Sequence, residues 1–563
     1  MCCVINILQH LDVWTSAVET RSTAGRGSSN KLNLYGIKKL RELILELAVR
    51  GQLVPQNPDD EPASVLLEKI ATEKARLIKD GKLKKQEPLP PITDDEKPFE
   101  LPEGWEWVRL IDLALPQAGF AFKSANFNEH GYGLPLIRIR DVGQEFTGTY
   151  YDGDYRDEFV VKNGDYLVSM DGQFRVASWL RNDALLNQRV SRLIFYSNRI
   201  TKSFIADALQ ARLIELQGVK AYTTVDHLSG GQIAGSIISL PPEAEQHRIV
   251  AKVNELMSLC DALEQEQAAN IAAHQTLVEE LLAALTQNEG NSWARIAAHF
   301  DTLFTTEHSI DQLKQTILQL AVMGRLDSPM QNDSDVGSLL EEICKEKEAF
   351  KQDVGAALEN KKNNRVLLKT RFFCDFITKG TTPSKNELLE QGDIPFLKVY
   401  NIVNNTLDFD YKPTFISKFV HNGKLKRSRV FPADIIMNIV GPPLGKVAII
   451  SDQYLEWNIN QALVAFRPLC GIINKYIFYM LSSSNILSDV LNEVKGTAGQ
   501  DNLSLEQCRD LLIPIPSIEE QHRIVAKVDE LMALCDAMKA QLKTAQTTQL
   551  QLADVLAEQA VMV

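Results

Sequence analysis

The sequence predicts an α+β fold in which two mixed, β-rich α/β domains are joined by long helices that form a coiled-coil spacer. The whole arrangement is expected to repeat about a pseudo-twofold axis. A nineteen-residue segment occurs at 245–263 and again at 520–538, with sixteen identical positions at an offset of 275. The stretch before each copy also carries the same ordered series of strand-like landmarks. A long internal repeat of this kind indicates two similar units in one chain.

The N-terminal region 1–102 is expected to be helical. Residues 36–53 align with 309–326 at an offset of 273, with nine of eighteen positions identical, and 64–74 align with 337–347 at the same offset. The repeated helical scaffold therefore occupies three regions, which we place at 1–102, 241–365 and 516–563.

The two intervening stretches, 103–240 and 366–515, are predicted to be one fold with different loops. LPLIR at 134–138 resembles IPFLK at 394–398, and LLNQRV at 185–190 resembles INQALV at 459–464. Alternation with period two predicts a half-buried strand at the first landmark. It places one set of side chains on a common face in each copy: Leu136, Arg138 and Arg140, and then Phe396, Lys398 and Tyr400.

Each long duplicated segment is predicted to be one amphipathic helix. A stretch of 43 residues, 243–285, would form a helix roughly 64 Å long. Apolar residues follow a 4-3 spacing typical of a coiled-coil seam. In the first copy these are Ile249, Val253, Leu256, Cys260, Leu263, Leu277 and Leu281. In the second copy they are Ile524, Val528, Leu531, Cys535, Met538, Leu542, Leu552 and Leu556. The middle of the first seam is polar, at Gln267, Asn270 and His274.

Composition indicates an ordinary soluble protein. The chain has 563 residues, of which 45% are hydrophobic and 24% charged. No apolar run approaches the roughly 18 residues that a membrane span needs, and the N-terminus lacks a basic leader, so we expect a cytoplasmic protein without a membrane partner. The eight cysteines show no metal-ligand spacing. The net charge of −13 lies almost wholly outside 103–240 and 366–515, which carry −2 and +2.

Long polar side chains near the landmarks are candidates for DNA contacts. Arg and Lys hydrogen-bond guanine edges and Asn and Gln hydrogen-bond adenine edges, while a basic run such as NGKLKRSR suits phosphates. The candidates in 103–240 are Lys123, Arg138, Arg140, Gln173, Arg175, Asn187, Gln188 and Arg189. Those in 366–515 are Lys379, Thr381, Thr382, Lys398, Asn401, Lys424, Lys426, Arg427, Arg429, Asn438, Asn460 and Gln461.

Motifs for catalysis are missing from the sequence. The segment GPPLGK at 441–446 has the wrong spacing for a phosphate-binding loop, and neither GxSxG nor HExxH occurs. No N/D-P-P-aromatic motif of an amino-methyltransferase is present. We therefore predict a non-catalytic protein with no metal site and no cofactor of its own.

Two variable stretches, each followed by a repeated helix that begins P-x-x-EQ-x-RIV, resemble the specificity subunit of type I restriction–modification enzymes. The signatures are 241–250 and, less exactly matched, 516–525, together with LPLIR and IPFLK. The opening segment 15–56 resembles the type IB branch. The resemblance covers essentially the whole chain.

The resemblance implies that each variable stretch is a target recognition domain that binds one half of an asymmetric, interrupted site in double-stranded DNA. It implies that the helices fix the spacer between the halves. Two methyltransferase subunits and the restriction/translocase subunits are the implied partners, and S-adenosylmethionine, ATP and Mg²⁺ belong to them. Two alternatives stay open: a coiled-coil assembly adaptor whose variable domains bind proteins, which the acidity favours, and a solitary methyltransferase or nuclease.

Overall fold

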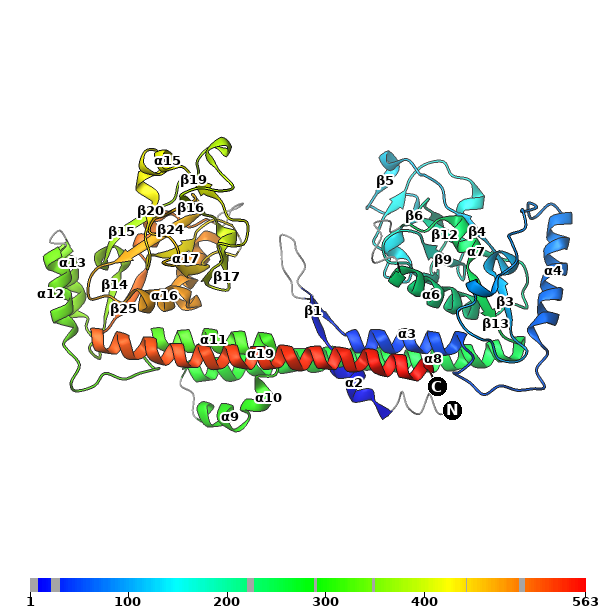
Figure 1. The fold of residues 1–563 in the computed structure, drawn as a ribbon, viewed down its shortest axis with the longest axis horizontal. Coiled ribbons are helices and arrows are strands. Elements are labelled where there is room, and N and C mark those ends of the chain that lie inside the picture. Colours follow the sequence, from blue (N-terminus) through cyan, green and yellow to red (C-terminus); the bar gives the residue numbers. More distant parts are fainter. Residues whose placement is uncertain are drawn as a thin grey trace. The chain divides into compact units, whose positions relative to one another are not determined.

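The structure, a computed structural model, describes residues 9–21, 31–219, 227–287, 291–346, 350–441, 443–495 and 502–562 (Figure 1). Residues 22–30 of the opening segment lie outside the described residues. The chain divides into two compact units. Unit 1 contains Met1–Asn270 and Ala545–Val563, and unit 2 contains Ile271–Thr544. No helix of the described residues is long and apolar enough to cross a membrane.

Two 45-residue helices, α8 (Glu243–Gln287) and α19 (Ile518–Met562), each contribute to both units. The predicted long helices are therefore confirmed. The polar middle of α8 coincides with the point where the chain passes from unit 1 to unit 2, at Asn270 and Ile271. The shorter scaffold helices are α2 (Leu11–Ser16), α3 (Tyr35–Val49), α4 (Ala63–Lys79), α9 (Ser292–Ala298), α10 (Phe300–Leu303), α11 (Glu307–Val322), α12 (Val336–Glu346) and α13 (Lys351–Glu359).

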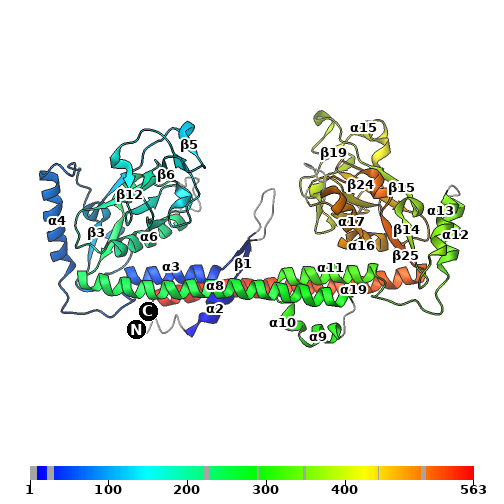
Figure 2. The same ribbon diagram turned by 180° about the vertical axis from the view of Figure 1, so that it is seen from behind.

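Within each unit a short helix packs beside the long ones, α3 in unit 1 and α11 in unit 2 (Figures 1 and 2). Arg41 of α3 pairs with Asp261 of α8. At the repeat-equivalent positions of unit 2, Lys314 of α11 pairs with Asp536 of α19. The duplicated sequence thus makes the same helix contact twice, with the roles of α8 and α19 exchanged.

The apolar stripe of the long helices departs from the predicted 4-3 spacing at one position in each copy. Cys260 and Cys535 are buried as predicted, but Leu277 is 50% exposed and Leu552 is 44% exposed. The buried residues are instead the next ones along, Val278 at 1% and Ala553 at 0%. Each lies 18 residues after its cysteine, which is about five turns of a straight α-helix. The predicted 4-3 seam was therefore wrong at Leu277 and Leu552, the same place in both copies, whereas Leu281 is buried as predicted.

The domain of unit 1 that precedes α8 contains two sheets. The four-stranded sheet has the order β10-β9-β12-β4, with β4 Ala114–Ala118, β9 Tyr166–Ser169, β10 Val176–Ser178 and β12 Val190–Phe195. The other has the order β5-β7-β6-β11-β8, with β5 Phe127–Asn128, β6 Leu134–Ile137, β7 Tyr150–Tyr151, β8 Val160–Val161 and β11 Ala184–Leu186. The helices of this domain are α5 (Leu110–Leu113), α6 (Lys202–Val219) and α7 (Gly230–Gly235).

Unit 2 repeats this topology. Its first sheet has the order β15-β24-β21-β22, with β15 Cys374–Lys379, β21 Ile435–Asn438, β22 Val447–Ile449 and β24 Leu463–Pro468. Its second has the order β19-β16-β23-β20, with β16 Ile394–Leu397, β19 Phe415–Ile416, β20 Arg429–Val430 and β23 Trp457–Ile459. A small ribbon pairs β17 (Ile402–Val403) with β18 (Thr406–Leu407). The helices are α14 (Thr370–Phe373), α15 (Lys418–Asn422), α16 (Asn474–Ser482), α17 (Ser484–Lys495) and α18 (Leu505–Arg509). In each unit one parallel pair, β6 with β11 or β16 with β23, interrupts an otherwise antiparallel pattern.

The strands at the first landmark end earlier than predicted. β6 stops at Ile137 and β16 at Leu397, and a turn of 3₁₀ helix follows each, η3 (Ile139–Asp141) and η8 (Val399–Asn401). The predicted strand faces carrying Arg138 and Arg140, and Lys398 and Tyr400, are therefore wrong. All four residues of β16 are buried, so both faces of this strand are covered and its sequence shows no polar alternation.

A buried glutamine in the first turn of each long helix connects that helix to the β-rich domain that precedes it in the chain. In unit 1, Gln246 donates to the Pro241 carbonyl (3.0 Å) and accepts from the Thr201 amide (3.2 Å). In unit 2, Gln521 donates to the Pro516 carbonyl (3.1 Å) and accepts from the Ile473 amide (2.9 Å). Short ribbons, β3 (Glu106–Arg109) with β13 (Ile237–Leu240) and β14 (Val366–Lys369) with β25 (Leu512–Ile515), close each domain just before its helix.

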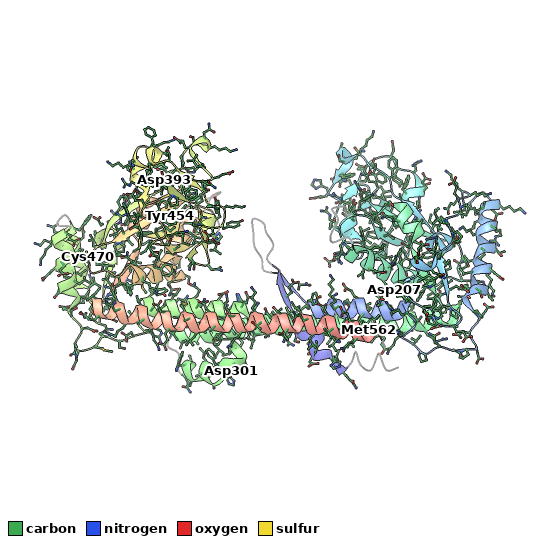
Figure 3. The ribbon with its side chains drawn as sticks, viewed as in Figure 1. Asp207, Asp301, Asp393, Tyr454, Cys470 and Met562 are labelled. Carbon is green, nitrogen blue, oxygen red and sulfur yellow. The ribbon has the colours of Figure 1, made fainter. Side chains whose placement is uncertain are left out.

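Helix α6 carries an acidic side chain at its packed face (Figure 3). Burial raises the pKa of the Asp207 carboxyl to about 7. Between the unfolded value near 3.8 and about 7, the folded chain keeps a proton that the unfolded chain has lost. This contribution to stability is therefore complete below that window and is lost as the pH rises through it.

We predict that Asp207→Asn raises the unfolding temperature of unit 1 by roughly 5 °C at pH 8, because the amide removes the cost of a buried charge. At about pH 4 the two proteins should unfold together. Thermal unfolding of the full chain at both pH values checks this. The control is Asp152→Asn, an exposed carboxyl in the same domain. A gain at pH 8 that persisted at pH 4 would contradict the assignment.

Candidate nucleic-acid interface

Four loops of unit 1 meet where β12 begins. The Met170 amide, just after β9, donates to the Arg189 carbonyl (3.0 Å), and the Leu228 amide donates to Met170 (2.7 Å). The Phe120 amide, just after β4, donates to the Leu186 carbonyl (2.9 Å). These bonds join the loop after β4, the β9–β10 turn, the β11–β12 turn and the segment before α7. We call this arrangement the loop frame.

Unit 2 has the same frame built from different residues. The Ile439 amide donates to the Ala462 carbonyl (2.8 Å), and the Leu503 amide donates to Ile439 (2.9 Å). The Thr381 amide donates to the Ile459 carbonyl (3.2 Å). Two stretches without comparable sequence identity therefore form one backbone arrangement, as the shared order of landmarks predicted.

A glycine in each unit is needed for this close approach. A Cβ added to Gly119 would lie 2.1 Å from the Asn187 carbonyl oxygen, and one added to Gly380 would lie 2.0 Å from that of Asn460. Both distances are far inside van der Waals contact, and the obstacle is backbone. Any larger residue would push apart the loop after β4 or β15 and the turn that carries Asn187 or Asn460.

The turn that follows β9 or β21 is organised by a buried polar side chain. The Ser169 hydroxyl accepts from the Arg175 amide (2.9 Å). In unit 2, Asn438 donates to the Pro443 carbonyl (2.9 Å) and accepts from the Lys446 amide (2.7 Å). Asn438 is only 1% exposed. Its amide is used within the fold and does not reach the surface, where a base edge would have to lie.

Asn401 also serves the fold. It is 1% exposed and accepts from the Lys398 amide (3.0 Å) at the start of η8, while its own amide donates to the Asp408 and Tyr411 carbonyls, both at 3.1 Å. In unit 1 the corresponding position is Asp141, which caps η3. Sequence reasoning took Asn401 for a base-contacting residue because polarity alone does not distinguish a buried cap from an exposed donor.

The loop frames bring together most of the sequence-predicted candidates and leave others elsewhere. Around the frame of unit 1 lie Lys123, Gln173, Arg175, Asn187, Gln188 and Arg189. Around that of unit 2 lie Lys379, Thr381, Thr382, Asn438, Asn460 and Gln461. The candidates at η3 and η8 are separate: Arg138, Arg140, Lys398 and Asn401. Arg140 is exposed and donates to Thr147 (3.0 Å), and Lys398 donates to Thr414 (3.3 Å).

The remaining basic candidates occupy the segment 418–429 of unit 2, which contains α15 and η9 (Lys426–Ser428). Lys424 pairs with Glu387 (3.0 Å), and Arg429 pairs with Glu456. Lys426 and Arg427 are exposed, and neither has an acidic partner within 4 Å among the residues that the structure describes. These two cations are therefore available to an outside anion.

A buried histidine holds this segment on the sheet. His421 is 0% exposed and contacts Glu456 through Nε2 (3.1 Å), while Asn458 donates to its Nδ1 (3.1 Å). Burial is the largest influence on the imidazole and lowers its pKa, so Nε2–H donates to the carboxylate and Nδ1 accepts. These contacts anchor the basic segment to the sheet, while Lys426 and Arg427 remain exposed.

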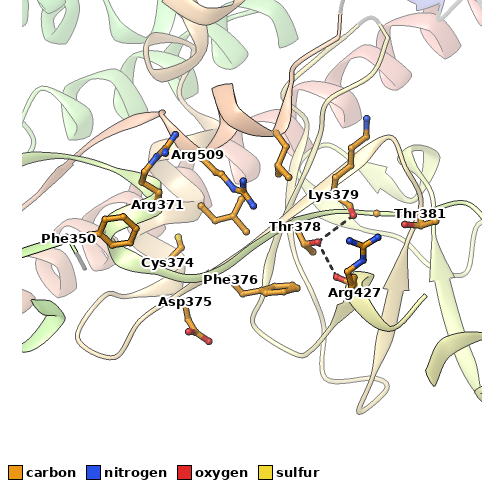
Figure 4. Close-up of a pocket in the computed structure, with 13 residues that line it drawn as sticks. Phe350, Arg371, Cys374, Asp375, Phe376, Thr378, Lys379, Thr381, Arg427 and Arg509 are labelled. Atoms are coloured by element: carbon orange, nitrogen blue, oxygen red, sulfur yellow. Dashed lines mark hydrogen bonds between the residues drawn. The ribbon is translucent and has the colours of Figure 1, made fainter. Parts of the chain in front are cut away.

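A cavity of about 710 Å³ lies beside this segment and β15 (Figure 4). Its lining includes Lys379, Thr381 and Arg427, which are sequence-predicted candidates from two distant segments. Arg371 and Arg509 also line it and were missed, because nothing near them in sequence marks a loop cluster. Both are paired with carboxylates of α18 and the residue after it, Glu506 or Asp510. The unneutralised positive charge therefore comes mainly from Lys379 and Arg427.

Neither unit shows a metal centre in its described part. No group of three His, Cys, Asp or Glu side chains there is arranged to hold an ion. What the frames offer chemically is hydrogen bonding and positive charge on exposed loops.

The comparisons agree on one family. A family model described as "Type I restriction modification DNA specificity domain" matches residues 102–273 and 372–546. The EcoAI specificity subunit of Escherichia coli is 36% identical over 597 aligned positions, covering 99% of each chain. The EcoEI specificity subunit of Escherichia coli is 35% identical, covering 98% of this chain and 99% of the relative. A solved chain from a type I R-M system is 18% identical with a TM-score of 0.45, covering 82% of this chain and 99% of its own.

We predict that Gly119→Ala destabilises unit 1, because the new Cβ would overlap the Asn187 carbonyl. The expected loss is about 2 kcal/mol or more, measured as the free energy of unfolding in urea. Gly230→Ala is the matched control, since a Cβ there would meet nothing within 4 Å. Equal stability of the two variants would show that the turn moves aside freely.

Proposed function

The chain belongs to the family of type I restriction enzyme specificity subunits, and we propose that it binds an asymmetric, bipartite site in double-stranded DNA, one half-site per recognition domain. The observation that carries this proposal is the duplicated loop frame: one backbone arrangement occurs twice and carries different side chains in each unit. Two equal scaffolds with unequal contact residues are what recognition of two unequal half-sites requires.

We further propose that the chain recruits two methyltransferase subunits and the restriction/translocase subunits and supplies no chemistry itself. Under this proposal S-adenosylmethionine, ATP and Mg²⁺ act on those subunits. The duplicated helix contacts, Arg41 with Asp261 and Lys314 with Asp536, support two equivalent docking surfaces. The family description, which names DNA specificity, favours this function over a protein-binding adaptor.

Exchange of a recognition domain is the direct test. Replacing 103–240 with the corresponding domain of another such subunit should change one half-site of the methylated sequence and leave the other half intact, because each frame is complete within its unit. Sequencing of modified bases in cells that carry the matching methyltransferase gene reads out both halves. A map in which both halves changed would refute the assignment of one half-site per domain.

The basic segment of unit 2 should contribute affinity without sequence preference. We predict that Lys426→Gln together with Arg427→Gln lowers the salt dependence of DNA binding by the assembled methyltransferase, reducing the slope of log K against log [salt] by about 2. Competition between cognate and altered sites should be unaffected, since phosphates carry no sequence information. Lys82→Gln, an exposed lysine of the N-terminal region, is the control. An unchanged slope would remove this segment from the interface.

A further inference from the structure

Three side chains of unit 1 converge on the loop frame from different loops. Asp171 follows β9, Arg189 precedes β12 and His227 precedes α7, and a backbone bridge pairs Asp171 with His227. Arg189 Nε lies 3.2 Å from Asp171 Oδ2, and His227 Nδ1 lies 2.6 Å from Asp171 Oδ1. The side chain of Arg189 is 52% exposed, while that of Asp171 is 25% exposed.

The less exposed carboxylate of Asp171 therefore orients the more exposed side chain of Arg189. His227 donates from Nδ1 to Asp171 Oδ1, while Arg189 contacts Oδ2 through Nε and Oδ1 through Nη1 (3.4 Å); Arg189 Nη1 also lies 3.2 Å from His227 Nδ1. An arginine fixed in this way loses less side-chain entropy when it forms paired hydrogen bonds than a free one does. The ligand edge for which a guanidinium is suited, among base pairs, is O6 and N7 of guanine.

In unit 2 the same three backbone positions carry different chemistry. Val440 and Asn502 form the equivalent bridge, and the Ala462 carbonyl accepts from Ile439 as the Arg189 carbonyl accepts from Met170. The residue after Asp171 and the residue after Val440 are both glycines with positive φ, +67° and +80°. Charged Asp171 and Arg189 thus correspond to apolar Val440 and Ala462.

We infer that this is a specificity-determining position in both domains, with Arg189 contacting a guanine in the first half-site and Asp171 as its positioning residue. At the counterpart position, Val440 (37% exposed) and Ala462 contact the C5-methyl group of a thymine. This inference rests on the proposed function, because it names the base that one loop frame recognises. It explains why an exposed loop of unit 1 carries the charged pair Asp171 and Arg189 while the equivalent positions of unit 2 carry uncharged residues.

The test compares modified-base maps of cells carrying the full set of subunits with wild-type chain, Arg189→Ala or Asp171→Asn. Arg189→Ala should relax one guanine position of the first half-site, lowering discrimination there about tenfold or more, and leave every other position unchanged. Asp171→Asn should relax the same position less strongly, whereas a merely structural role would weaken all positions together. Arg181→Ala, an exposed arginine of the same domain, is the control.

The reciprocal variant, Val440→Asp with Ala462→Arg, should create a guanine preference at one position of the second half-site. Relaxation spread over all positions, or an unchanged map for Arg189→Ala, would overturn the inference while a bipartite wild-type map still supported the proposed function. A wild-type chain that directed no sequence-dependent modification would overturn the proposed function itself.

Discussion

The buried glutamine at the start of each long helix is the contact on which the use of this fold depends. Gln246 and Gln521 are both 0% exposed, and each satisfies its amide with two backbone groups on either side of the domain–helix junction. Leaving such a buried group unpaired costs about 1–3 kcal/mol. Each domain is therefore held to its own helix by a bond set that tolerates little change, which explains why EQ heads both copies of the repeat.

The neighbouring carboxylate shows how far the two junctions have diverged around that fixed point. Glu245 accepts from Gln56 (2.7 Å) and Trp105 (3.0 Å), and its burial raises the pKa of the carboxyl. Glu520 instead pairs with Arg365. One junction satisfies the carboxylate with neutral donors and the other with a cation. The glutamine contact is the same in both units while the residues around it differ. The loop frames show the same pattern, since the backbone hydrogen bonds recur while the side chains differ.

The sequence predicted correctly those features that occur twice in the chain. It failed for individual residues whose role depends on whether the side chain is buried. The long helices, the shared order of strands and the basic run at 422–429 follow from repetition and charge, both of which can be read directly from the sequence. The one-residue shift of the stripe, from Leu277 to Val278, depends on a helix geometry that a 4-3 pattern only approximates. Asn401 and Asn438 were misjudged because a buried amide and an exposed one have the same composition.

Asp171 and His227 illustrate the opposite error. Both are polar residues of the loop frame that were not identified as candidates from the sequence. They lie 18 and 38 positions from Arg189, so the sequence alone does not show that they contact it. Aligning Asp171 with Val440 in the second landmark would have identified a position where one copy has a charged residue and the other an apolar one. The partner of Arg189, by contrast, follows only from the pairing of strands β9 and β12.

The two domains also differ in how they supply positive charge. Between β19 and β20 unit 2 contains α15, whereas unit 1 passes from β7 to β8 by a shorter loop, and each connection ends in a turn of 3₁₀ helix, η9 in unit 2 and η4 (Asp157–Phe159) in unit 1. Lys426 and Arg427 lie in η9, outside the loop frame, and the matching turn of unit 1 carries Asp157 and Glu158, so the charge at these positions can change without disturbing the frame loops. Under the proposed function, affinity for phosphate and choice of base are therefore assigned to separate parts of the chain, so that a domain could change its sequence preference while keeping its affinity for DNA.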